Sequence, residues 1–100
     1  MHLADSIFLI GQLSENSVIC AREPFTRGSE AVIAEFTHDY RIPEHIKAEG
    51  YAYFLGKADV EELLEMMSGK RASRETTAEF VCHYATHDAY PSWFYELPHE

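Results

Sequence analysis

The segment Ser73–Phe94, SRETTAEFVCHYATHDAYPSWF, decides the fold, because it predicts one long helix followed by an aromatic cluster. Ser73 is a residue type that caps helix N-termini, and Glu75 follows in the first turn, where an acidic side chain is favourable. Pro91 cannot continue a helix, so we expect the helix to end at Tyr90-Pro91. We expect the aromatic residues that follow to fold back onto a sheet and close the core.

Short apolar segments upstream of this helix predict the strands of that sheet. Each is rich in apolar or aromatic residues and bounded by turn residues, which is typical of buried strands. The predicted strands are Ser6–Gly11, Val18–Arg22, Ala31–Phe36 and Tyr51–Gly56. The first two are close enough in sequence to form a hairpin with a longer loop.

Two further segments predict helical structure. Pro43 is suited to the first position of a short helical turn that ends before Gly50. Farther along, Asp59 is expected to cap a helix that ends at Gly69. Its apolar residues recur at the spacing of one helical face: Val60, Leu63, Leu64 and Met67.

The order of strands followed by helices predicts an α+β fold in a single domain, residues 1–100. We expect a mainly antiparallel sheet of about four strands, with the two C-terminal helices packed on one of its faces. A chain of this length can bury enough apolar surface for one core without disulfides.

The chain carries 17 acidic residues against 8 lysines and arginines, which gives a formal net charge of −9. The excess is spread along the chain and is not confined to a tail. A field of this sign repels nucleic acid and anionic membranes and attracts basic partners. Ordinary solubility is the alternative explanation, in which case the protein is a generic acidic binding or regulatory module.

Cys20 and Cys82 are the only cysteines, and both lie among apolar residues. Two cysteines are no disulfide framework, so we expect free buried thiols and a reducing, cytoplasmic location. The N-terminal residues lack the basic start of a signal peptide, and no stretch reaches the ~20 apolar residues of a membrane span.

Histidines offer one route to catalysis. His83 and His87 are four residues apart, so they share a helix face and could hold a metal ion in a small metal-dependent enzyme. A zinc site needs three or four ligands, which His38, Asp39 or His45 would have to complete in three dimensions.

Other catalytic chemistry has less support. Cys82 precedes His83, but adjacent residues of a helix point to different sides. No glycine-rich phosphate loop is present, and the one basic cluster, Lys70, Arg71 and Arg74, has acidic neighbours. We therefore assign no catalytic, cofactor or metal residue and expect a protein that is not an enzyme.

Three features resemble small bacterial proteins that neighbour polymorphic toxins. An early strand is followed by the extended segment Val18–Glu23, and the Pro43–Gly50 loop leads into a strand and the helix Val60–Leu64 (VEELL). The final helix ends in the string Tyr84–Pro91, YATHDAYP. Some such proteins act as immunity proteins in contact-dependent growth inhibition. The resemblance carries over no functional residue.

The resemblance implies a small cytoplasmic protein without a cofactor that neutralises a cognate basic toxin domain, commonly a nuclease, by one-to-one binding. Charge complementarity would give such a complex its specificity and a fast association rate. Acids on predicted loops and helix surfaces are the candidate partner contacts: Asp39, Glu44, Glu49, Glu61, Glu65, Asp88 and Glu96. The aromatic cluster after the last helix is either a core element or part of this contact surface.

Overall fold

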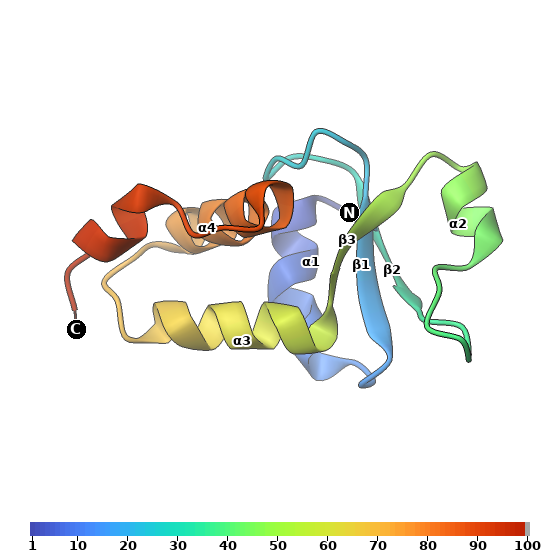
Figure 1. The fold of residues 1–100 in the computed structure, drawn as a ribbon, viewed down its shortest axis with the longest axis horizontal. Helices are drawn as coiled ribbons and strands as arrows, with labels where there is room; N and C mark the ends of the chain where they lie inside the picture. Colours follow the sequence, from blue (N-terminus) through green and yellow to red (C-terminus); the bar gives the residue numbers. More distant parts are fainter. Residues whose placement is uncertain (100) are drawn as a thin grey trace.

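The computed structural model describes residues 1–99, which form an α+β fold around a three-stranded antiparallel sheet (Figure 1). The elements in chain order are α1 (Leu3–Leu9), the 3-10 turn η1 (Ile10–Gln12), β1 (Ser17–Ala21), β2 (Ala31–Glu35), α2 (Glu44–Ala48), β3 (Ala52–Gly56), α3 (Lys57–Ser68), α4 (Arg74–His87) and the 3-10 turn η2 (Ser92–Glu96). The predicted α+β class and antiparallel sheet are confirmed. No helix within residues 1–99 is long and apolar enough to cross a membrane.

The central strand of the sheet is β1, because the strand order is β2-β1-β3. All five residues of β1 are buried. Val18 and Cys20 face the smaller of two hydrophobic clusters, and Ile19 and Ala21 face the larger one. A strand covered on both faces needs apolar residues at consecutive positions, which explains the unbroken apolar run from Val18 to Ala21.

The first predicted strand, Ser6–Gly11, is wrong, because these residues belong to α1 and η1. The buried positions Leu3, Ser6, Ile7 and Ile10 follow the i, i+3, i+4, i+7 spacing of a helix. The buried hydroxyl of Ser6 donates a hydrogen bond to the Leu3 carbonyl at 2.7 Å, so its polar group is satisfied inside the helix. The expected hairpin with β1 does not form, and within residues 1–99 the sheet has three strands.

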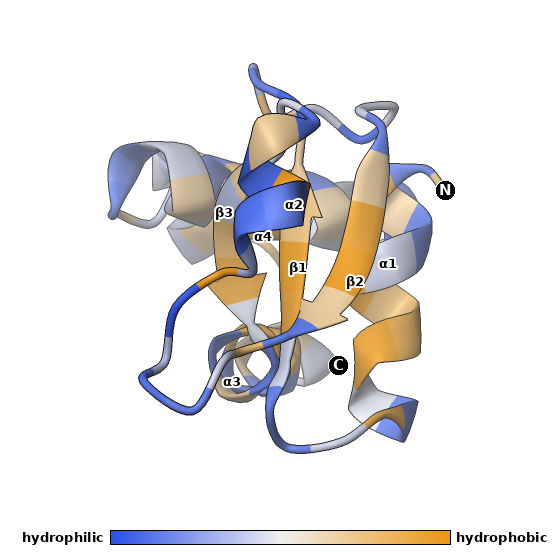
Figure 2. Cartoon of the chain, turned by 90° about the vertical axis from the view of Figure 1, so that its right-hand side faces the viewer, coloured by the Kyte–Doolittle hydropathy of each residue, from blue (hydrophilic) through white to orange (hydrophobic). Residues whose placement is uncertain are grey.

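The smaller cluster lies between the sheet and α2. Ile42 and Ile46 pack there against Val18 and Cys20, together with Tyr51. Figure 2 shows α2 lying in front of this apolar sheet face. The predicted helical turn is confirmed, although Pro43 is its N-cap and not its first residue. This turn covers one side of the sheet.

The larger cluster lies on the opposite side and includes residues of α1, α3 and α4. Among these helices, α3 contacts β1 and β3, whereas α4 packs mainly against α1 and α3. In Figure 1, α3 and α4 extend side by side away from the sheet. The expected packing of both C-terminal helices on one sheet face is not confirmed.

A β-bulge in β3 shapes the sheet edge. Ile19 pairs with Leu55 and Cys20 pairs with Tyr53, so Phe54 is an extra residue without a direct partner. Consecutive strand residues normally face opposite sides. The bulge instead allows both Phe54 and Leu55 to enter the larger cluster, while Tyr53 stays on the solvent-exposed edge, with 44% of its surface exposed.

Helix α3 begins earlier than predicted, directly after β3. Gly56 is its N-cap, so Asp59 lies inside the first turn and is not the cap. Lys57 is buried in this turn, where its Nζ donates to the Leu13 carbonyl at 2.7 Å and lies 3.3 Å from a Glu15 carboxylate oxygen. The predicted end of the helix at Gly69 is confirmed.

Helix α4 starts as predicted but ends before Tyr90-Pro91. Its last residue is His87, and Asp88 takes the left-handed conformation (φ 52°) with its N–H bonded to the Tyr84 carbonyl at 2.8 Å. Left-handed residues commonly terminate helices, and Asp tolerates this conformation better than most side chains. The chain therefore turns back at Asp88, three residues before Pro91.

The aromatic cluster packs on α4, not on the sheet as predicted. The Phe80 ring is fully buried and has Tyr90, Trp93 and Phe94 around it at centroid distances of 5.8, 6.3 and 4.9 Å. In Figure 1, η2 lies at the end of the molecule farthest from α2. The cluster thus covers the face of α4 that carries Phe80.

Replacing Ser73 with alanine tests the N-cap of α4. The Ser73 hydroxyl accepts a hydrogen bond from the Thr76 N–H at 3.1 Å. Losing it leaves a helix N–H without a protein partner, and we expect a loss of about 1 kcal/mol in the free energy of unfolding. Urea denaturation followed by circular dichroism measures this. Ser68→Ala in the last turn of α3 is the control, and an equal loss there would contradict the cap assignment.

Candidate functional site

The acids predicted to bind a partner do not gather on one surface. All seven (Asp39, Glu44, Glu49, Glu61, Glu65, Asp88 and Glu96) are exposed. Three lie in or next to α2, two lie on α3, one follows α4 and one is in η2. Since α2 and η2 lie at opposite ends of the molecule in Figure 1, and its long axis measures 42 Å, one compact interface cannot hold them all.

One of these acids, Asp88, borders a depression with a volume of about 350 Å³ between β3, the first turn of α3 and the end of α4. We call it the β3 groove. Its lining consists of Tyr53, Phe54, Leu55, Asp59, Tyr84, Ala85 and Asp88. The lining contains two carboxylates and no lysine or arginine, so it combines aromatic surface with negative charge.

Each side chain of the β3 groove is placed by a local feature of the backbone. Because β3 runs into α3 at Gly56 without a loop, Asp59 lies one helical turn from the strand that carries Tyr53. The left-handed turn at Asp88 holds the second carboxylate beside the last turn of α4, which carries Tyr84. The two acids therefore approach one groove from separate helices.

The pKa values of the two tyrosines in the β3 groove are raised, in part by its negative charge. Burial raises the pKa of Tyr84, and the charges of Asp88, Asp59 and Glu62 raise it further. The pKa of Tyr53 is also raised, mainly by burial and then by the charge of Asp59. Both shifts arise because partial burial of the ring and the nearby carboxylates disfavour the phenolate.

This combination of groups suits a cationic side chain. A carboxylate can form a charge-assisted hydrogen bond with a guanidinium or ammonium group. A tyrosine ring attracts the same cation through its face. Asp59 and Asp88 supply the first kind of contact, while Tyr53 and Tyr84 supply the second.

A second depression, of about 480 Å³, adjoins the β3 groove because Tyr53 lines both. Its other residues are Phe36, Tyr40, Arg41, Ile42 and Lys47. Phe36 lies 6.4 Å, between ring centroids, from both Tyr40 and Tyr53. Tyr40 is 78% exposed and sits in the left-handed conformation (φ 61°). The aromatic surface thus continues from the β3 groove toward α2.

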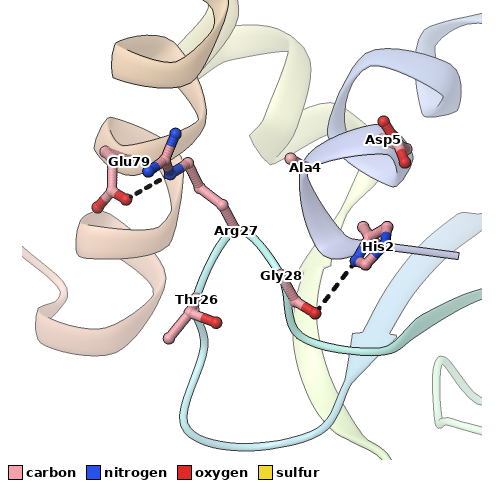
Figure 3. Close-up of a pocket in the computed structure, with 7 residues that line it drawn as sticks. All are labelled: His2, Ala4, Asp5, Thr26, Arg27, Gly28 and Glu79. Carbon is pink, nitrogen blue, oxygen red and sulfur yellow. Dashed lines mark hydrogen bonds and ion pairs between the residues drawn. The ribbon is translucent and has the colours of Figure 1, made fainter.

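A third depression, of about 470 Å³, lies between α1, the loop after β1 and α4 (Figure 3). Its polar groups are mostly engaged with each other. Arg27 pairs with Glu79 at 2.7 Å, and a ring N–H of His2 points at the Gly28 carbonyl at 3.2 Å. Both members of the ion pair are about half exposed, which makes the pair weak. These contacts tie the loop to α1 and α4.

The residues considered for catalysis come together only as one pair of histidines. His83 and His87 are adjacent on α4, with ring centroids 4.5 Å apart. His38 and Asp39 lie in the loop between β2 and α2, and His45 lies in α2. No three His, Cys, Asp or Glu side chains within residues 1–99 come together as a metal site. Both cysteines are free and buried, as predicted, and burial raises the pKa of Cys20 to about 11 and that of Cys82 to about 12. Neither thiol is thereby activated as a nucleophile.

The β3 groove was missed at the sequence level except for Asp88. Asp59 stood out as a helix cap, Tyr53 as an aromatic position of a strand, and Tyr84 as the first residue of the string Tyr84–Pro91. The concentration of aromatic residues in Tyr51–Phe54 was the one signal for it.

Comparisons with known proteins give no further guidance on this site. No protein-family model matches the chain, and no curated protein or solved structure matches it either. A function for the chain is therefore inferred from the chemistry of its own residues.

Proposed function

We propose that this chain is an immunity protein that binds a cognate basic toxin domain and neutralises it by one-to-one association, without catalysis. The β3 groove is the observation that supports this most directly, because it joins two carboxylates to exposed aromatic surface and its lining includes no lysine or arginine. The net charge of −9 and the sequence resemblance point in the same direction.

The proposed complex places a lysine or arginine of the toxin domain in the β3 groove. Tyrosines are frequent among the residues that dominate binding energy at protein interfaces. Tyr53 is 44% exposed and Tyr90, next to Tyr84, is 39% exposed, so both offer aromatic surface to a partner. A toxin whose substrate is a nucleic acid would carry basic residues in its active site, and covering them would block substrate entry.

The remaining candidate acids have a different role in this proposal. Glu61 and Glu65 on α3, and Asp39, Glu44, Glu49 and Glu96 farther away, are exposed and contribute to the long-range field. Such charges accelerate encounter with a basic partner more than they strengthen the final complex. The free, buried cysteines fit a protein that acts in the cytoplasm, where we place it.

Charge reversal in the β3 groove tests the proposal. The partner to use is the basic C-terminal toxin domain that this proposal expects a neighbouring gene to encode, and the measurement is isothermal titration calorimetry. We expect Asp59→Lys with Asp88→Lys to weaken binding roughly 100-fold or more, because a cation of the partner would lose two carboxylate partners and meet like charge in their place.

The matched control is Glu44→Lys with Glu49→Lys at α2, which changes the net charge equally but outside the lining of the β3 groove. We expect it to slow association modestly and to leave dissociation almost unchanged. Equal weakening by both pairs would reject the β3 groove as the docking site. Absence of any complex at micromolar concentrations would reject the function itself.

A further inference from the structure

The paired histidines of α4 take no part in the β3 groove or in the larger core. His87 is exposed and His83 is partly exposed, one helical turn before it. Their ring centroids lie 4.5 Å apart with 46° between the ring planes. Two imidazoles this close on one helix face can reach the same ion, because metal–nitrogen bonds to histidine are about 2.0–2.1 Å long.

A backbone contact fixes the tautomer of His83. Its Nδ1 lies 3.1 Å from the Ala89 carbonyl oxygen, which can only accept a hydrogen bond, so Nδ1 carries the proton. The Nε2 atom of the neutral ring therefore keeps its lone pair. Histidines that bind metals almost always donate their other ring N–H in this way. The left-handed turn at Asp88 brings the Ala89 carbonyl back toward the helix.

The electrostatic setting also favours a cation. His87 is the last residue of α4, and the carbonyl groups of a helix C-terminus carry partial negative charge. Glu79, one turn before His83 on the same face, is paired with Arg27 at 2.7 Å. The pair thus forms a two-ligand site with its remaining coordination positions open to solvent.

We propose that His83, through Nε2, and His87, through a ring nitrogen, bind one divalent transition-metal ion of the zinc, nickel or copper class. Imidazole nitrogen suits these ions, whereas magnesium and calcium prefer oxygen ligands. Water, or a donor group of a binding partner, fills the other positions. This site is independent of docking in the β3 groove, since the two use different side chains.

The test is calorimetric titration of the untagged full chain with Zn²⁺ and, separately, with Ni²⁺. We expect one ion per chain with a dissociation constant below about 1 mM, the weak end of measurable affinity. His83→Gln and His87→Gln should each weaken binding about tenfold or more. Gln is a good helix former, so the fold should survive either change. The matched control is His38→Gln with His45→Gln, which should bind like the unaltered protein.

A second measurement on the unaltered chain does not depend on any variant folding. Imidazole nitrogen NMR during the titration should move the His83 and His87 signals first, with His83 retaining its proton on Nδ1. Equal weakening by the control pair, movement of all histidine signals together, or no heat of binding up to 1 mM metal would each overturn the proposal.

Discussion

Replacing Phe80 with alanine is expected to lower the free energy of unfolding by about 3–5 kcal/mol, which is the range for removing a buried aromatic ring. Phe80 is fully buried and joins α4 to three aromatic rings of the C-terminal segment. Without its ring, Tyr90 and Phe94 lose a common packing surface and a cavity remains. A loss this large is a substantial part of the stability of a small domain.

Urea denaturation measures this loss, with two signals followed in parallel. Circular dichroism reports on all the helices, and fluorescence reports on Trp93, the single tryptophan, whose ring lies 6.3 Å from that of Phe80. Tyr95→Ala is the control, because this side chain is 69% exposed and its loss should change stability by less than about 0.5 kcal/mol. A change below about 1 kcal/mol for Phe80→Ala would show that the aromatic cluster does not pack on α4.

Alkaline pH is expected to destabilise the fold through its two thiols. Burial raises the pKa of Cys20 to about 11 and that of Cys82 to about 12, from 9.0 for an ordinary thiol, and Glu79 adds to the shift of Cys82. The folded-state pKa is the higher one, so this stabilisation is complete below about pH 9 and is lost as the pH rises toward 11 to 12. One pKa unit corresponds to about 1.4 kcal/mol, so the full loss amounts to several kcal/mol.

The measurement is urea denaturation at about pH 8.5, pH 10 and pH 11, analysed as a slope of unfolding free energy against pH. Cys20→Ala with Cys82→Ala serves as the comparison, since all the other titratable groups are the same in both proteins. The double variant should start less stable but lose stability less steeply. Parallel slopes in the two proteins would mean that the thiols do not contribute.

Elements with strong local signals could be predicted from the sequence. The β2 segment alternates Val32, Ala34 and Phe36 on the α2 side, and these three side chains do pack together there. Ser73 was recognisable as the cap of α4 because side-chain capping depends on residues only a few positions apart. The ends of α3 and α2 could be predicted for the same reason, because a glycine close in sequence marks each of them, Gly69 and Gly50.

Elements with short or competing signals could not be predicted. The run Ile7–Ile10 has only four apolar residues, which fit a buried strand and a helix equally well. The helical spacing emerges only when Leu3 and a buried serine, Ser6, are included. The predicted start of α3 was wrong because its N-cap is Gly56, which has no side chain that could cap the helix. Asp59 was therefore the more conspicuous candidate for the cap.

The β3 groove lay beyond sequence reasoning for a different reason. Tyr53 and Asp59 belong to one strand–helix junction, whereas Tyr84 and Asp88 belong to the end of a helix some thirty residues later. Only the packing of α3 beside α4 brings them together. Of the acids selected by exposure and charge, Asp88 alone shares this groove, because periodicity within one element does not reveal how separate elements are placed.

The loop-free junction between β3 and α3 affects how much conformational entropy the protein would lose on binding a partner. A receptor surface built on loops must give up conformational entropy when a partner immobilises it, which reduces affinity. Here Tyr53 and Asp59 are carried by a hydrogen-bonded strand and the first turn of a helix, with Lys57 anchored to the Leu13 carbonyl between them. The backbone of this receptor surface is preorganised, so most of the ordering entropy on association would fall on the partner.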